Sequence, residues 1–332
     1  MIKLSAGTAQ ILGLKKLTTD APPSTAYLMQ GNKCTQDCGF CPQARTASSR
    51  VDLLSRVTWA EGKRAEILTG LGTAFAQGIL KRACLQVIDS RSGLEQVRET
   101  VQAIKHNSDI PICVSTKVHS QEELLALAEL GVDKIGLALD AACARVYKAT
   151  KTGSWAEAIG QIQEATRLLP GRISTHLIVG LGETEEEMVT MLQTMQDLGV
   201  TAGLFAFTPV AGTKMALVKP PDLVQYRRIQ VAHLLIRNNL IKRDNCSFSD
   251  SGQLIDYGLA KQKLKAVLQE GMAFQTSGCP DCNRPYYNEK PGGVIYNYPR
   301  PLDRTEIQAA VELVLNSLVY SENESGEMRY PG

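Results

Sequence analysis

The sequence predicts an α/β protein with the TIM-type (β/α)8 barrel fold, and three observations support this fold class. Between Thr25 and Thr276, short apolar runs alternate with longer amphipathic runs, as in repeated βα units around a parallel sheet. Eight of the apolar runs are candidate strands, and several intervening runs open with Ser, Thr or acidic residues, which favour helix N-termini. A cysteine-rich turn directly follows the first run, where such a barrel places its catalytic loops.

The predicted strands occupy residues 25–30, 83–90, 110–117, 134–140, 172–180, 201–208, 240–246 and 272–277. Predicted helices between them include residues 120–130, 155–169, 183–198 and 223–238. We therefore expect three parts: an N-terminal extension (1–24), the barrel (25–282) and a C-terminal extension packed on the barrel (283–332). The last part is irregular because it is rich in Pro and Gly, up to a helix near 304–318.

The amino-acid composition argues against several classes of function. The chain has 36 basic and 34 acidic residues, a balance that predicts neither a nucleic-acid partner nor an anionic membrane surface. No apolar run approaches the ~20 residues of a membrane span, and the N-terminus lacks a signal-peptide pattern. The nine cysteines are an odd number with one tight cluster, which favours reduced thiols and metal binding over a disulfide framework. We expect a cytoplasmic protein.

The tight cluster is Cys34, Cys38 and Cys41, with an aromatic residue, Phe40, before the last cysteine. Three thiolates at this spacing can bind a [4Fe-4S] cluster and leave its fourth iron without a protein ligand. A zinc site or unpaired core cysteines are the alternatives. A zinc site usually needs a fourth Cys or His close by, and the sequence has none nearby.

Alternation along the strands predicts which side chains face the barrel interior. The apolar residues of each strand must lie under the helices, so the residues between them point inward. The predicted inward residues are Cys84, Gln86, Ile88, Cys113, Ser115, Lys117, Gly136, Ala138, Asp140, Ser174, His176 and Ile178. Any one polar group could find a hydrogen-bond partner in a neighbouring residue. Burying the whole set costs free energy unless the set binds a ligand.

A glycine turn, Gly180-Leu181-Gly182-Glu183, follows the fifth predicted strand. Such glycines often do no more than close a strand-to-helix turn, so the motif alone is a weak signal. At this place in a barrel the glycines would let the backbone approach a flat ring, and main-chain groups could pair with the edge of an adenine.

Together these motifs resemble biotin synthase and its relatives among the radical S-adenosylmethionine (SAM) enzymes, from about residue 25 to 215. The resemblance rests on the cysteine triad, Leu137-Ala138-Leu139-Asp140, Thr150-Lys151-Thr152 and the run 178–184. It implies a radical SAM fold and a [4Fe-4S] cluster with SAM, whose cleavage yields a radical that abstracts hydrogen from an unactivated carbon.

The same resemblance suggests roles for individual residues. The implied cofactor-binding residues are Phe40, Ser115, Asp140, Lys151, Gly180, Gly182 and Glu183. Lys151 stands where the family has an arginine and could pair with the methionyl carboxylate. Asp140 would contact the ribose or the substrate, and Asp140 and His176 are the candidate catalytic residues.

Biotin synthase also holds a second cluster, with cysteines on strands two, three and five and an arginine on strand seven. Cys84 and Cys113 match the first two positions, whereas Ser174 and Asn245-Cys246 depart from the pattern. The pair Cys279-Pro280-Asp281-Cys282 offers a substitute, although such a pair can also be redox-active or zinc-binding. The candidate ligands of this auxiliary cluster, in order of preference, are Cys279, Cys282, Cys246, Cys84 and Cys113.

The segment 279–293 resembles the C-terminal region of the two-protein lipoyl synthases. That resemblance implies a radical SAM sulfurtransferase that adds sulfur from the auxiliary cluster to a protein-bound octanoyl chain. The implied partners are an octanoylated lipoyl domain or glycine cleavage H protein, a sister radical SAM component, and a ferredoxin or flavodoxin. The alternatives are a biotin synthase-like, methylornithine synthase-like or maturase-like enzyme acting on a small molecule, and a metal-binding scaffold without activity.

Overall fold

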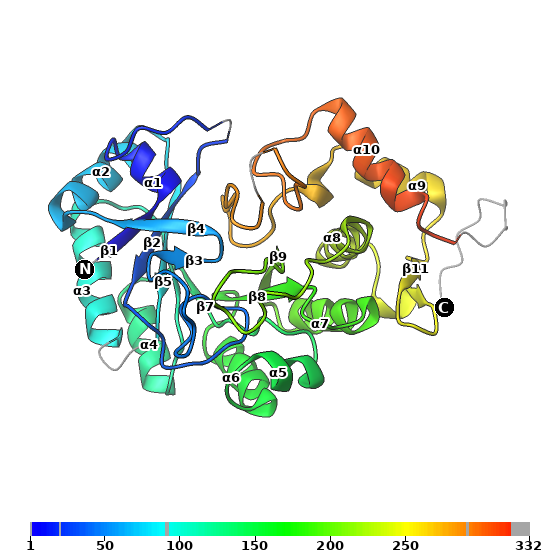
Figure 1. Cartoon of the computed structure of the whole chain (residues 1–332), viewed down its shortest axis with the longest axis horizontal. Coiled ribbons are helices and arrows are strands. Elements are labelled where there is room, and N and C mark those ends of the chain that lie inside the picture. The colour runs from blue at the N-terminus through cyan, green and yellow to red at the C-terminus, as the bar shows by residue number, and fades with distance from the viewer. Residues whose placement is uncertain (1, 20, 90–92, 290–291, 320–332) are drawn as a thin grey trace.

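The structure, a computed structural model, describes residues 2–319 except 20, 90–92 and 290–291. Its centre is a nine-stranded sheet in the order β3-β4-β1-β2-β5-β6-β7-β8-β9. Six of these strands are parallel, and helices cover the outside of their curled surface (Figure 1). The predicted TIM-type α/β architecture is confirmed, as a partial barrel.

The parallel strands follow the predicted ones closely. They are β2 (Thr25–Gln30), β5 (Arg82–Val87), β6 (Ile112–Ser115), β7 (Lys134–Gly136), β8 (Ile173–Val179) and β9 (Thr201–Ala206). The helices that connect and flank them are α2 (Arg64–Ala76), α3 (Gly93–Asn107), α4 (Gln121–Glu129), α5 (Ala144–Thr150), α6 (Trp155–Leu168), α7 (Glu185–Asp197) and α8 (Leu223–Arg237). Ser90, the predicted end of the second strand, lies outside the described residues.

The prediction of a seventh and an eighth barrel strand is wrong for the described residues. Residues 240–246 contain a short 3-10 helix, η1 (Arg243–Asn245), and residues 272–277 contain another, η2 (Met272–Phe274). Nearby, β10 (Ser247–Phe248) pairs with β11 (Leu254–Asp256) in a separate two-stranded sheet. The run 242–245 is entirely polar, so it has no apolar face to place under a covering helix.

Because β9 is the last strand of the sheet, one of its edges is open, and side chains cover this edge. Ser277 accepts a hydrogen bond from the amide of Leu204 at 2.9 Å, and Arg284 donates to the carbonyl of the same residue at 3.2 Å. Asn288 donates to the carbonyl of Ala206 at 2.8 Å. A strand edge exposes unpaired backbone groups that need partners. The C-terminal segment supplies those partners here and brings residues 277–288 against the inside of the sheet.

The N-terminal residues extend the sheet on its other side. The strand β1 (Ile2–Ser5) pairs antiparallel with β2 and with β4 (Val57–Glu61), and β3 (Leu53–Leu54) pairs with β4. Helix α1 (Ala6–Ile11) follows β1 and begins at the cap Ser5. The strands β1, β3 and β4 were not among the predicted ones.

The core has two layers, as alternation along the strands predicts. Between sheet and helices lies a large apolar layer that includes Leu85, Val114, Ile135 and Leu177, all buried. A smaller group lies inside the curled sheet and consists of Tyr27, Met29, Trp59, Ile88 and Tyr287. The predicted faces of β5, β6 and β8 are therefore confirmed. The strand predicted over 134–140 is shorter, because β7 ends at Gly136, and Leu137 and Leu139, which alternation would place on the outer face, line the cavity at the carboxyl ends of the strands.

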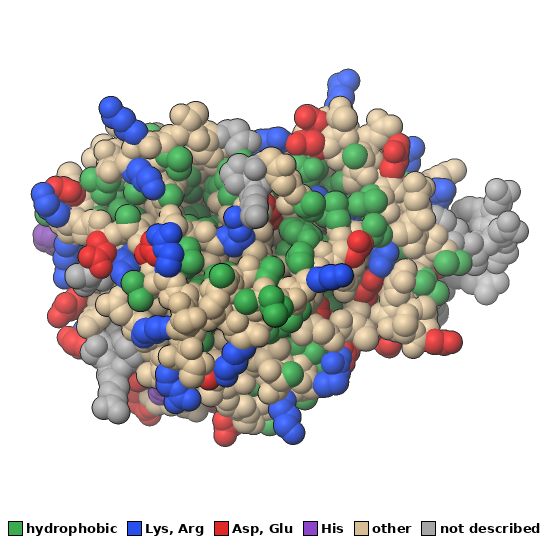
Figure 2. All heavy atoms as spheres, in the orientation of Figure 1, with side chains coloured by type: hydrophobic (Ala, Val, Ile, Leu, Met, Phe, Trp, Pro, Cys, Tyr) green, Lys and Arg blue, Asp and Glu red, His purple; other side chains and the backbone are tan. Residues whose placement is uncertain are grey.

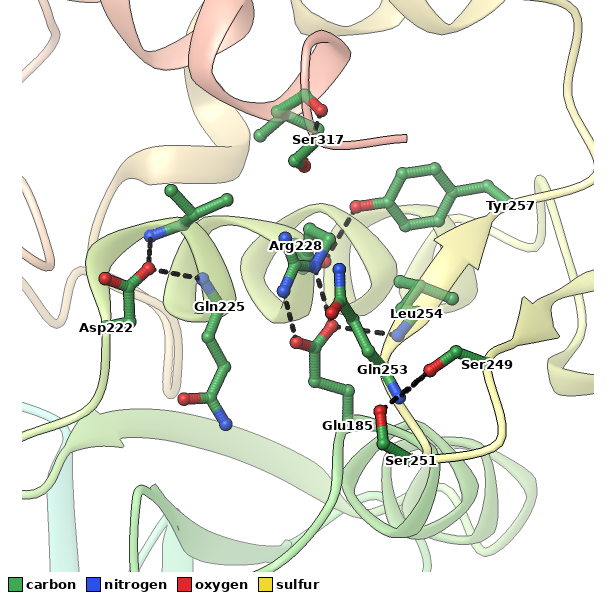
Figure 3. Close-up of polar contacts among 12 residues, drawn as sticks. Glu185, Asp222, Gln225, Arg228, Ser249, Ser251, Gln253, Leu254, Tyr257 and Ser317 are labelled. Atoms are coloured by element: carbon green, nitrogen blue, oxygen red, sulfur yellow. Dashed lines mark hydrogen bonds and ion pairs between the residues drawn. The ribbon is translucent and has the colours of Figure 1, made fainter. Parts of the chain in front are cut away.

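A buried ion pair fixes α7 and α8 against the segment that follows η1 (Figure 3). The Glu185 carboxylate accepts hydrogen bonds from Arg228 at 2.5 and 2.8 Å and from the amide of Leu254 at 3.1 Å. Both charged side chains are less than a tenth exposed. The Tyr257 hydroxyl donates to the Arg228 carbonyl at 2.9 Å. These contacts anchor β11 on the helices at the point where barrel strands are missing.

Of two further helices, α10 (Arg304–Leu315) packs against α8, and α9 (Lys261–Leu268) packs against α10 (Figure 1). Among the described residues, none of the helices combines the length and the apolar character that crossing a lipid bilayer requires.

Candidate functional site

A cavity of about 350 Å³ opens at the carboxyl ends of the parallel strands. The predicted site residues that line it are Cys34, Cys38, Phe40, Cys41, Ser115, Asp140, Lys151 and His176. Parallel strands bring the loops that follow them to one end of a sheet, which is why residues from β2 to β9 meet here. The cavity therefore unites most of the residues predicted around the cysteine triad.

The triad lies in the loop that follows β2. The Cys34 amide donates to the Gln43 carbonyl at 2.8 Å, and the Gly39 amide donates to the Thr150 carbonyl at 2.7 Å. Burial raises the pKa of Cys41 to about 12, and burial also raises the pKa values of Cys34 and Cys38. The free thiols are therefore protonated at neutral pH, and binding of a metal has to displace their protons.

The donor chemistry of this loop fits an iron-sulfur cluster. In the part of the chain that the structure describes, no three His, Cys, Asp or Glu side chains converge as ligands of a single ion would. A [4Fe-4S] cluster does not require such convergence, because each thiolate binds a different iron. Three unpaired thiols that line one cavity satisfy the requirement of a cluster with one open iron.

Asp89, two residues after β5, clamps the start of the triad loop. Its carbonyl accepts from the Thr35 amide at 3.0 Å, and its carboxylate accepts from the Thr35 hydroxyl at 2.5 Å and from Gln36 at 2.9 Å. His119 reaches the other carboxylate oxygen at 3.2 Å. Burial opposes the charge of Asp89, but these hydrogen bonds prevail and hold its pKa below the usual value.

Asp140 and Lys151 form an ion pair in the cavity wall. The two side chains meet at 2.5 Å and are only 12% and 10% exposed, and Lys151 also donates to the Ala138 carbonyl at 2.7 Å. Burial alone would lower the pKa of Lys151, yet the charge of Asp140 raises it, so the ammonium is retained.

Asp140 has an unusual backbone conformation, with φ at +64°. Its amide donates to the His176 carbonyl, and its carbonyl accepts from the Ile178 amide, both at 2.8 Å. Residues other than Gly adopt this left-handed region rarely, although Asp tolerates it better than most. The bonds to β8 hold Asp140 in this conformation at the mouth of the cavity.

His176 lies on the inner face of β8, with its ring 5.0 Å from that of Phe205. Burial lowers the pKa of His176 to about 4, and the positive charges of Arg284 and Lys151 contribute in the same direction. The imidazole is therefore neutral at pH 7. It could accept a proton or a hydrogen bond but carries no charge to offer an anion.

The glycine turn does not line the cavity, and its part in cofactor binding stays a prediction. Gly180, Gly182 and Glu183 are not among the residues that line the cavity, whereas the neighbouring Ile178 is. The Glu183 carboxylate folds back and accepts from the amides of Gly180 at 2.6 Å and Leu181 at 3.0 Å. In this structure the Glu183 side chain therefore provides hydrogen-bond acceptors for the backbone amides of its own turn.

A second group of thiols lies deeper in the curled sheet. Cys84 and Cys113 are neighbours on β5 and β6, and Cys279 shares a hydrogen bond with Cys113. The Cys282 sulfur lies 3.4 Å from the hydroxyl oxygen of Tyr27. Tyr27 is on β2 and is the neighbour of Cys84 on β5. Four cysteines from two distant parts of the chain thus gather at one place, which we call the inner thiol group.

Two arginines accompany the inner thiol group. Arg82 donates to the Cys113 sulfur at 3.2 Å and to the Pro280 carbonyl at 3.1 Å. Arg284 approaches the Cys282 sulfur at 3.6 Å and lies 4.0 Å above the Phe205 ring. Both guanidinium groups favour ionised sulfur close to them.

The thiols of this group differ in acidity. The hydrogen bond from Cys113 is the main cause that lowers the pKa of Cys279, and the Ser174 hydroxyl and the two arginines act in the same direction against burial. The same hydrogen bond raises the pKa of Cys113, and burial raises that of Cys84. Among Cys84, Cys113 and Cys279, it is therefore Cys279 whose ionised form the fold favours.

Cys246 does not join this group. It follows η1, lies in the outer apolar layer and is 8% exposed. Its sulfur faces the Lys242 carbonyl at 4.0 Å, and the charged groups that affect it are acidic residues and Arg243 rather than other cysteines. The missing seventh strand explains this, because no strand carries residue 246 to the barrel interior.

Sequence reasoning missed Arg82, Arg284 and Tyr27. Arg82 could have been found, because it lies two residues before Cys84 and shares its face of the strand. The predicted strand began one residue too late. Arg284 carried no such signal, since its place depends on the return of the C-terminal segment into the sheet.

Comparison with known proteins agrees with the fold and the triad. The profile of the Radical SAM superfamily matches residues 29–195. A biotin synthase of Hydrogenobaculum sp. (strain Y04AAS1) is 29% identical over 195 residues, which is 56% of this chain and 56% of that protein. A biotin synthase of Desulforudis audaxviator (strain MP104C) is 27% identical over 218 residues, 64% of each chain.

The chain thus spans little more than half the length of the first of these biotin synthases. Among solved structures, methylornithine synthase is similar with a TM-score of 0.51 at 15% identity, over 64% of this chain and 62% of that one. At such an identity the likeness concerns the fold alone. The profile match extends over half of the sequence and includes the triad, so the chain belongs to the radical SAM superfamily.

Proposed function

We propose that this protein is a radical SAM sulfurtransferase of the lipoyl synthase type, which inserts sulfur into an unactivated C–H bond of a protein-bound octanoyl chain. One observation carries the proposal. The inner thiol group of Cys84, Cys113, Cys279 and Cys282 lies in the same curled sheet as the triad, so the chain offers two separate sets of cluster ligands.

The triad would hold a [4Fe-4S] cluster whose open iron binds SAM. When bound, this pair supplies the abstraction of hydrogen from an unactivated carbon. Lys151 presents an ammonium to the cavity and would meet the methionyl carboxylate, while Asp140 would orient the ribose or the substrate. The neutral His176 would donate or accept a hydrogen bond at the substrate without adding charge.

The inner thiol group would hold the auxiliary cluster that donates sulfur. Its four thiols are enough for a complete cluster, and Arg82 and Arg284 would stabilise the negative charge of the bound thiolates. The relatives named biotin synthase support a reaction of this general kind. Cys246 is no longer a leading ligand in this proposal, because its side chain packs in the outer layer.

The cavity beside the triad suits an acyl chain. Its wall carries many apolar side chains, among them Leu54, Val87, Ile88, Ile178 and Phe207. An extended hydrocarbon loses its contact with water there, and such burial is favourable. A sister radical SAM component and an octanoylated lipoyl domain or glycine cleavage H protein complete the proposed reaction.

Two measurements test the proposal. Anaerobic reconstitution should load roughly seven to eight irons per chain, which corresponds to two cubane clusters. Turnover with an octanoylated lipoyl-domain peptide, with and without the sister component, should then add sulfur that mass spectrometry detects. About four irons and a product without sulfur would overturn the proposal in favour of a one-cluster enzyme.

The variant Cys279→Ala with Cys282→Ala refines the first measurement. It should lose about half of the iron while cleavage of SAM persists, because the triad is untouched. Release of no 5′-deoxyadenosine by the reduced, reconstituted protein would contradict every enzymatic interpretation and support a metal-binding scaffold.

A further inference from the structure

We propose that the outer surface of the triad loop, together with the loop that follows β9, is a docking surface for a small acidic electron-transfer protein. This surface consists of residues 43–51 and 210–219 and is called the basic loop face below. The inference goes beyond the proposed function, because it rests on the triad and the fold and not on sulfur transfer.

The two loops of this surface form one unit. The Met215 amide donates to the Gly39 carbonyl at 3.0 Å, and the Ser48 amide donates to the Gly212 carbonyl at 2.9 Å. Ser49 adds a hydrogen bond to the Ala211 carbonyl at 2.7 Å. These hydrogen bonds hold the two loops together, so that they form one surface.

The tip of this unit exposes apolar side chains to water. Leu217 is 98% exposed, and Val218 is 41% exposed beside it. On the other loop, Val51 is 59% exposed. Apolar side chains surrounded by polar and charged ones are typical of protein interaction sites. In Figure 2, apolar side chains reach the surface near the centre of the view, with Lys and Arg around them.

The charge of the region is strongly positive. The basic loop face contains four basic residues, Arg45, Arg50, Lys214 and Lys219, and no acidic residue. Arg50 and Lys214 pair with Asp52 and Asp37 at its edge. The whole chain has a net charge of only +2, so the remainder of the molecule is slightly negative. Clustered charge of one sign attracts a partner of the opposite sign and accelerates its encounter.

The position of the surface points to electron transfer and not to substrate binding. A hollow of about 190 Å³ beneath the loops is lined by Cys38 and Cys41 together with Gly212 and Lys214. This hollow is separate from the larger cavity, although Cys38 and Cys41 line both. A cluster bound at the triad would receive its electron from another molecule, and a donor bound to the basic loop face would lie next to this hollow.

Lys214 links the basic loop face to the triad. Its ammonium lies 2.6 Å from the Asp37 carboxylate, between Cys34 and Cys38, and this contact holds the pKa of Asp37 well below its usual value. A test variant should leave this pair intact, since its loss would disturb the triad loop. Leu217 and Lys219 have no such contact with the triad and are the better targets.

The test measures how fast the reconstituted protein is reduced. A flavodoxin of net negative charge is the probe, and dithionite, a small reductant, is the reference. In Leu217→Ser/Lys219→Glu, reduction by flavodoxin should slow at least about tenfold at low salt, and reduction by dithionite should stay unchanged. The wild-type rate with flavodoxin should fall as salt rises, and that dependence should weaken in the variant.

A matched control carries the same two types of substitution elsewhere. Leu125→Ser with Lys263→Glu changes a partly exposed leucine and an exposed lysine outside the basic loop face, and should behave as the wild type. An unchanged flavodoxin rate in Leu217→Ser/Lys219→Glu overturns the inference. So does a variant that keeps this rate but loses affinity for the octanoylated lipoyl domain, which would assign the surface to the substrate protein. Neither result depends on whether sulfur is transferred.

Discussion

His176 should make the protein measurably sensitive to acid. Its pKa is about 4 in the folded protein, mainly because of burial, and about 6.5 in an unfolded chain. Below pH 6.5 the unfolded chain therefore binds a proton that the folded protein refuses, so the free energy of unfolding falls as the pH falls. Between pH 7.5 and pH 5 this one residue should remove about 2 kcal/mol of stability.

The variant His176→Phe isolates this contribution, because phenylalanine cannot bind a proton and packs as an aromatic ring beside Phe205. Urea denaturation of the metal-free protein at the two pH values gives the free energy of unfolding in each case. The loss of stability should be smaller in the variant than in the wild type by about 2 kcal/mol. The absolute stability of the variant does not enter this comparison.

His119→Phe is the control for the loss of an imidazole as such, since this side chain is half exposed. The reasoning is refuted when His176→Phe loses as much stability as the wild type between pH 7.5 and pH 5, because His176 would then be protonated in the folded protein.

Three further outcomes are expected. Glu185→Ala should lower the free energy of unfolding by about 3–5 kcal/mol because it leaves Arg228 buried without a partner, whereas Glu164→Ala at an exposed pair should change it far less. Iron analysis should find full loading in Cys246→Ala and reduced loading in Cys279→Ala. Gly180→Ala should lower the melting temperature, because φ is +99° and the new methyl group would lie 2.8 Å from Pro221.

Local patterns predicted the six parallel strands and their two faces. Each strand buries one face under helices, so its apolar residues recur at every second position whatever the rest of the chain does. The inward placement of Cys84, Cys113, Ser115 and His176 followed from that periodicity. The error of one residue at the start of β5 was enough to hide Arg82.

The last two predicted strands failed for a non-local reason, to which the polar run 242–245 added a local one in the seventh. Residues 240–246 and 272–277 contain apolar residues, but a strand is stable only when a neighbour pairs with its backbone. At β9 that neighbour is replaced by the side chains of Ser277, Arg284 and Asn288. No pattern within either segment could reveal that competition.

The sequence by itself identified the triad and predicted the family, since Cys34, Cys38 and Cys41 occur within eight residues at a spacing that suits three ligands of one cluster. Only the tertiary structure decided which other cysteines belong together. Cys84 and Cys279 are almost two hundred residues apart, and they meet because the C-terminal segment folds back into the open sheet. Their pKa values, likewise, depend on contacts that exist only in the folded chain: chiefly the hydrogen bond with Cys113 for Cys279, and burial for Cys84.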